Sequence, residues 1–67
     1  MVNMRLLEKD GEKMLFVFNH ENEAGKVAIL VDKGYTLEVL RGPEAKIKDN
    51  EISDMIEARN VSVYHLF

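Results

Sequence analysis

The sequence predicts a small α/β domain in two layers, with the element order β-β-α-β-α-β and an N-terminal β-hairpin. Three observations predict this fold class: a hairpin signal in residues 4–18, a helical spacing of apolar residues in residues 21–33, and two later segments that resemble each other. Of the 67 residues, 46% are hydrophobic and 31% are charged, with four Gly and one Pro. This composition is typical of a folded chain with one core, so we expect residues 1–67 to form a single domain.

The hairpin is the most specific signal in the chain. The Asp-Gly pair at residues 10–11 favours a two-residue type I′ turn, because both positions of that turn need a positive φ. Pairing outward from the turn places Lys9 opposite Glu12 and Glu8 opposite Lys13. Both pairs carry opposite charges, whereas a slip by one residue would place like charges opposite each other.

Residues 21–33 fit a helix or a strand. Apolar residues at the spacing i, i+3, i+4 and i+7 predict one helical face, which is formed by Ala24, Val27, Ala28 and Val31. A following Gly34 is typical of a helix end. Against a helix, Ile29 points to the opposite side and the segment is rich in β-branched residues. We predict the helix; the alternative is an α+β fold, a four-stranded antiparallel meander followed by one helix and a last strand.

The later part of the chain reads as strand, helix and strand. Residues 35–40 alternate as a strand, residues 49–59 carry Ile52, Met55 and Ile56 at a helical spacing, and residues 61–67 form a last strand. The segments "VDKGYTLEV" and "IEARNVSVY" share the order of helix end, basic residue, Gly or Asn, and strand. This similarity favours the helix in the middle segment and predicts three parallel strands joined by crossovers.

A Gly-Lys pair at residues 25–26 follows the hairpin, as it does in a phosphate-binding P-loop. In such a loop the first glycine allows a tight turn and a hydroxyl side chain after the lysine holds Mg²⁺. Here His20 occupies the first glycine position and Val27 the hydroxyl position. Glu21 and Glu23 would repel a polyphosphate, so the sequence argues against a P-loop.

A different anion site follows from the predicted topology. Ligands of open α/β sheets bind beyond the carboxyl ends of the parallel strands. In the predicted fold His20, Asn22 and Arg41 lie at or just beyond those ends. These three residues are therefore a candidate site for a small anion.

The sequence offers little for catalysis or for nucleic-acid binding. There is no Cys, and neither Ser53 nor Ser62 has a histidine placed to activate it. The two histidines lack metal-ligand spacing, so we predict no enzyme activity, cofactor or metal. Nine basic residues are scattered among twelve acidic ones, which disfavours nucleic acid as a partner. No apolar run approaches the ~20 residues that span a membrane, and cytoplasmic location is the default expectation.

The hairpin is apolar on both faces, which predicts an interface. Leu7, Met14, Phe16 and Phe18 lie on one face of the predicted hairpin. Successive right-handed crossovers place both helices on one side of the sheet, so the other side stays bare. A bare apolar face of this size usually marks an interaction site. We therefore predict a protein–protein interaction module, with a second copy of the chain or a larger protein as its partner.

Overall fold

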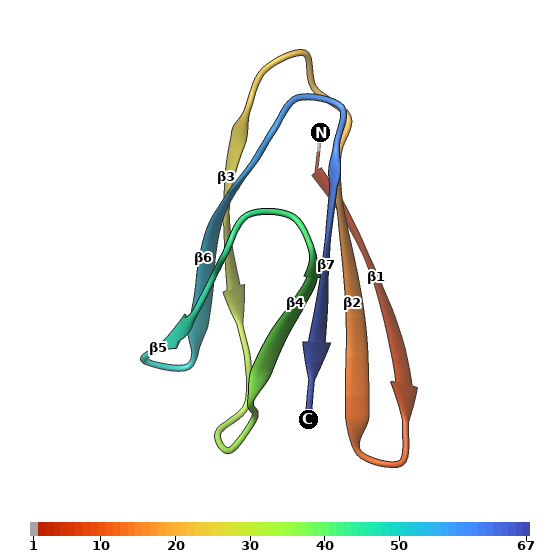
Figure 1. The fold of residues 1–67 in the computed structure, drawn as a ribbon, viewed down its shortest axis with the longest axis vertical. Helices are drawn as coiled ribbons and strands as arrows, with labels where there is room; N and C mark the ends of the chain where they lie inside the picture. The colour runs from red at the N-terminus through yellow and green to blue at the C-terminus, as the bar shows by residue number, and fades with distance from the viewer. Residues whose placement is uncertain (1) are drawn as a thin grey trace.

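The structure is a computed structural model that describes residues 2–67. Within that range it consists of seven strands and contains no helix (Figure 1). The strands are β1 (Val2–Lys9), β2 (Glu12–Asn19), β3 (Gly25–Leu30), β4 (Leu37–Arg41), β5 (Ile47–Lys48), β6 (Glu51–Ile56) and β7 (Val61–Leu66).

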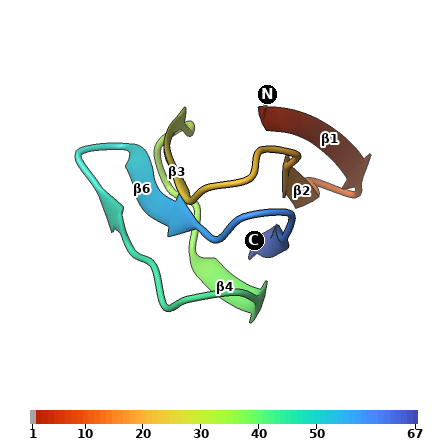
Figure 2. The same ribbon diagram turned by 90° about the horizontal axis from the view of Figure 1, so that it is seen from above.

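The strands form two antiparallel sheets that face each other (Figure 2). One sheet has four strands in the order β1-β2-β7-β4, and the other has three in the order β3-β6-β5. The connections β2–β3, β3–β4, β4–β5 and β6–β7 each pass from one sheet to the other. The architecture is therefore a small β-sandwich, in which the inner faces of the two sheets form the core.

The predicted hairpin is confirmed in its turn and its register. Asp10 and Gly11 have φ values of 52° and 81°, as a two-residue hairpin turn requires. Lys9 pairs with Glu12 and the register runs unbroken to the pair of Val2 with Asn19. The second hairpin strand, which is apolar on both faces, is central in its sheet, because β2 lies between β1 and β7.

The α/β fold class is wrong, and both predicted helices are strands. In residues 49–59 the helical spacing was misleading because Ile52 and Ile56 are four residues apart. That separation brings two side chains to one face of a strand as well as of a helix. Both isoleucines are buried in β6, with Asp54 between them on the same face. Because the polar Asp54 occupies an inward position, the sequence does not show the alternation of apolar and polar residues that is typical of a strand.

Residues 21–33 hold β3 and not a helix. Val27, Ile29 and Val31 alternate along the chain, and all three pack in or against the core. The meander alternative identified this strand but is wrong elsewhere: it expected a helix in residues 49–59, and β3 pairs with β6 while β4 pairs with β7. The predicted parallel strands are also wrong, since every strand pair in residues 2–67 is antiparallel.

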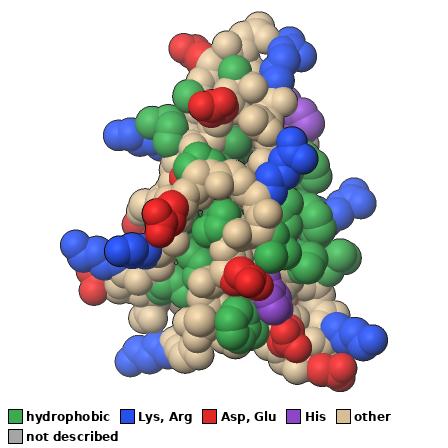
Figure 3. Space-filling model, in the orientation of Figure 1, with side chains coloured by type: hydrophobic (Ala, Val, Ile, Leu, Met, Phe, Trp, Pro, Cys, Tyr) green, Lys and Arg blue, Asp and Glu red, His purple; other side chains and the backbone are tan. Residues whose placement is uncertain are grey.

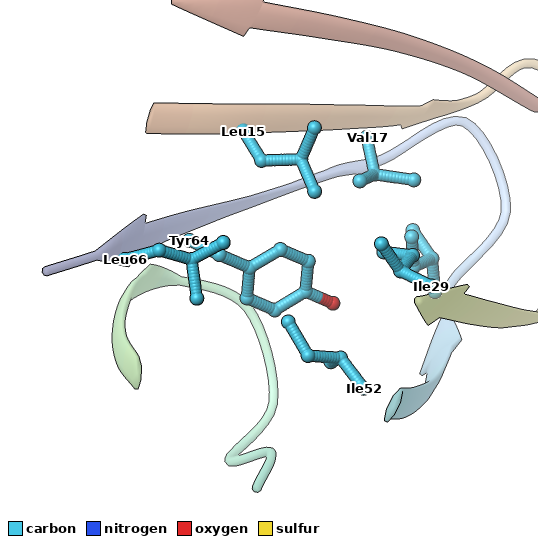
Figure 4. Close-up of a cluster of buried hydrophobic side chains, with 7 residues drawn as sticks. Leu15, Val17, Ile29, Ile52, Tyr64 and Leu66 are labelled. Carbon is cyan, nitrogen blue, oxygen red and sulfur yellow. The ribbon is translucent and has the colours of Figure 1, made fainter. Parts of the chain in front are cut away.

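The core lies between the sheets and consists of seven buried apolar side chains (Figure 4). They are Leu15, Val17, Ile29, Ile52, Ile56, Tyr64 and Leu66. The hydroxyl of Tyr64 donates a hydrogen bond to the carboxylate of Asp54, so this bond joins the two sheets across the core. Burial, reinforced by this hydrogen bond, raises the pKa of Tyr64 well above its usual value of 10.0.

Candidate interaction surface

The outer face of the four-stranded sheet carries the four predicted interface residues. Leu7 pairs with Met14 across the hairpin, and Phe16 and Phe18 follow at alternate positions of β2. Since alternate residues of a strand point to the same side, all four side chains share one face. We call this face, with its neighbours on β7 and β4, the outer face.

The strand register arranges the outer face in rows that run across the sheet. One row consists of Arg5, Phe16, Val63 and Arg41, and the next consists of Leu7, Met14, His65 and Glu38. Phe16 and Val63 form an apolar middle in the first row and Met14 continues it in the second, while the ends of the two rows on β4 carry opposite charges.

No other element of residues 2–67 covers the outer face, because the second sheet packs on the inner one. Leu7 keeps 55% of its surface exposed, and Phe16 and Phe18 are only partly buried. Figure 3 shows hydrophobic side chains on the right of the molecule between the two histidines, with acidic side chains beside the lower one. The surface therefore combines an apolar centre with charged ends.

The acidic end is organised around His65. Its Nε2 lies 2.7 Å from Glu12 Oε1 and its Nδ1 lies 3.2 Å from Glu38 Oε1. The hydrogen bonds to Glu38 and Glu12 raise the pKa of His65 above its usual 6.5. The ring also lies 4.8 Å from that of Phe67. Two carboxylates thus share one imidazole at this end.

The opposite end is basic. His20, Arg41 and Arg59 line one surface cavity of about 360 Å³, together with Phe18, Asn19, Asn60 and Val61. The ring of His20 stacks on that of Phe18 at 6.1 Å. Three side chains that carry or can accept positive charge therefore border the same space.

Asn19 holds the loops that form the basic end. It is only 2% exposed, and its Nδ2 donates to the carbonyl oxygens of Glu23, Ile56 and Glu57 at 2.9–3.2 Å. Its Oδ1 accepts from the backbone N–H of Glu21 at 3.0 Å. One buried amide thereby fastens the β2–β3 loop to the end of β6 and the β6–β7 connection.

Arg41 is placed by the end of β4. The register of β4 against β7 shifts between Val39 and Arg41, which indicates a β-bulge. The next residue, Gly42, has a φ of 112°, and a Cβ there would collide with the side chain of Ser62. Only glycine fits this close approach, so the turn that directs the chain away from Arg41 depends on it.

The predicted anion residues come together in part. His20 and Arg41 line the same cavity, whereas Asn22 accepts a hydrogen bond from Arg59 Nε at 2.8 Å. The topological reason given for this grouping is wrong, because the residues do not lie at the ends of parallel strands. The sequence reasoning also missed Arg59, which only the β6–β7 connection brings to this end.

The acidic end was missed as well, although the sequence contained a partial signal. Continuing the hairpin register shows that Glu12 faces the same side as Met14. The pairing of β7 with β2 and β4 places His65 between Glu12 and Glu38. That pairing is long-range, so no local pattern could reveal it.

Residues 2–67 contain no group of three or more His, Asp or Glu side chains arranged to hold a metal ion. In the same range there is no helix that could cross a membrane. No known protein family, characterised protein or solved structure shows a significant match to this chain.

Proposed function

We propose that the protein is a non-enzymatic interaction module that self-associates through its outer face. One observation carries this proposal: an apolar strip runs along the centre of the sheet on the side that the second sheet leaves uncovered. Exposed apolar patches of this kind commonly mark interaction sites in soluble proteins. The strip is formed by Leu7, Met14, Phe16, Phe18 and Val63.

A second copy of the chain suits the outer face because the face is complementary to itself. Consider a two-fold axis that lies in the interface at right angles to the strands, between the two central rows. It places Arg41 of each copy over Glu38 of the other, and Phe16 over Met14. An axis along the strands would instead place Arg5 over Arg41, where like charges repel. The charges therefore favour the first arrangement.

The dimer should be weak. Four strands about 4.8 Å apart and six residues of about 3.3 Å each give a planar contact of about 400 Å². A stable interface typically buries about 800 Å² on each partner. We therefore expect a dissociation constant of roughly 10–1000 µM, within the concentration range of sedimentation and NMR experiments.

Replacing an aromatic residue at the centre of the outer face tests the proposal. We expect Phe16→Thr to raise the dissociation constant at least about tenfold, because it removes apolar contact while keeping a good strand former. Leu30→Thr is the matched control, since Leu30 is 80% exposed on the outer side of the other sheet. Sedimentation equilibrium of both variants measures the effect. A wild-type protein that stays monomeric to about 1 mM, or equal effects of the two variants, would contradict self-association through this face.

Exchanging charges tests the orientation of the dimer. Arg41→Glu alone and Glu38→Arg alone each place like charges together, so both variants should dimerise less than the wild type. Mixing the two variants restores both attractive contacts, and we expect the mixed dimer to form preferentially over either homodimer. If dimers form but the mixture shows no preference, the orientation is wrong while self-association stands.

A further inference from the structure

The basic end of the outer face concentrates most of the chain's arginine in one place. The sequence contains three arginines and two histidines, and two of the arginines and one histidine line the cavity of about 360 Å³. The protein as a whole carries a net charge of −3. A basic cavity in an acidic protein is a local feature that the overall composition does not predict.

The arginines of this cavity are not neutralised by an ion pair within residues 2–67, and Glu57 lines only the neighbouring cavity, which shares Arg41. Neither Arg41 nor Arg59 forms an ion pair there, and no carboxylate lines the cavity. By contrast, His65 at the other end of the same sheet lies between two carboxylates. Two guanidinium groups that form no ion pair at one cavity favour an anion that carries more than one negative charge.

Arg59 and His20 have contacts that hold them in position before any ligand binds. Arg59 has a left-handed backbone with a φ of 53°, its Nε donates to Asn22 Oδ1, and its backbone N–H donates to the carbonyl of Glu21 at 3.1 Å. Since Nε is bound, the two terminal nitrogens of the guanidinium remain available. The stacking of His20 on Phe18 restricts the imidazole. Ordering such groups in advance lowers the entropy cost of binding.

The geometry points to a binding site for a phosphomonoester at this cavity. A phosphomonoester carries a charge of about −1.5 to −2 near neutral pH and presents three strong acceptor oxygens, which matches two guanidinium groups and an imidazole. The organic part of the ligand has an apolar wall to contact, formed by Phe18 and Val61. Asn60 adds a polar amide side chain at the rim. Since the proposed dimer places Glu38 of the second copy over Arg41, this site belongs to the monomer.

A titration with phenyl phosphate, followed by two-dimensional NMR of the labelled protein, tests the site. At about pH 7.5 the second ionisation of a phosphomonoester is largely complete, since its pKa is about 6. We expect saturable shifts confined to residues 18–20, 41–42 and 59–61. Inorganic phosphate should shift the same residues at higher concentration, and acetate at equal ionic strength should bind at least about fivefold more weakly than phenyl phosphate.

Arginine variants separate this site from general attraction to positive charge. Arg59→Asn keeps a residue that tolerates the left-handed backbone, and we expect it to weaken phenyl phosphate binding at least about fivefold. Arg41→Gln should have a similar effect. Lys48→Gln is the control, because it removes one positive charge on β5 of the other sheet, away from the cavity. Non-saturating shifts, an equal effect of Lys48→Gln, or acetate binding as tightly as phenyl phosphate would each overturn the proposal.

Discussion

The two faces of the four-stranded sheet have similar apolar content but different neighbours. On the inner face, Val17 and Tyr64 are completely buried against the second sheet. On the outer face, Phe16 and Val63 lie on the same two strands, and no element within residues 2–67 packs on them. Apolarity alone therefore does not locate the core of this protein. The inner side chains of β2 and β7 form part of the core, whereas the outer ones have no such cover within residues 2–67.

Truncating one aromatic residue on each face should give the largest contrast. Tyr64→Ala removes a fully buried ring and its hydrogen bond to Asp54, and we expect a loss of about 3–5 kcal/mol in unfolding free energy. A domain of this size has only about 3–5 kcal/mol of net stability, so this variant should be largely unfolded. Phe16→Ala should lose less than about 1.5 kcal/mol, because its ring keeps contact with solvent. Urea unfolding, followed by circular dichroism, measures both. Similar losses would contradict the division between the faces.

The buried amide of Asn19 should have the next largest effect. Asn19→Asp keeps the shape and the Oδ1 acceptor but cannot donate to the carbonyls of Ile56, Glu57 and Glu23. We expect a loss of about 2–3 kcal/mol, since buried carbonyl groups are left unpaired beside a new charge. Asn3→Asp is the control, because Asn3 is exposed on β1. Urea unfolding compares the two, and equal losses would show that Asn19 does not fasten the loops.

The hairpin could be predicted from the sequence because its information is local. The turn dipeptide and the opposite charges of its neighbours fixed both the turn type and the register, and hence the grouping of Leu7, Met14, Phe16 and Phe18 on one face. The same register shows that Arg5 and Glu12 share this face. No long-range knowledge was needed for either result.

The second sheet could not be predicted, for two physical reasons. A separation of four residues fits one face of a helix and one face of a strand, so Ile52 and Ile56 did not distinguish them. The β5–β6 turn at Asp49 and Asn50, with φ values of 53° and 60°, resembled a helix start because Asp also caps helices. The basic cavity depends on these strands, since Arg59 reaches it only through the β6–β7 connection. A partial list of its residues was therefore the most that the sequence could provide.

The smallest effect should come from the titration of His65 on the outer face. Its neighbours are Glu38 and Glu12, which raise its pKa, and Lys9, which pairs with Glu12 in the hairpin register. Because the folded pKa is the higher one, protonated His65 stabilises the fold fully below about pH 6.5. This contribution is lost as the pH rises through the folded value. We expect wild-type stability to decline over that interval.

His65→Gln removes the titrating group while keeping a polar side chain that can still donate a hydrogen bond to one of the two carboxylates. The variant should therefore show a flatter pH profile than the wild type between about pH 6 and pH 8. His20→Gln is the control, because His20 stacks on Phe18 at the basic end, away from Glu12 and Glu38. Thermal unfolding across this range distinguishes the variants. The effect should shrink in high salt, since the group lies at the surface. If both variants keep the wild-type slope, the two carboxylates do not act on His65 as the structure indicates.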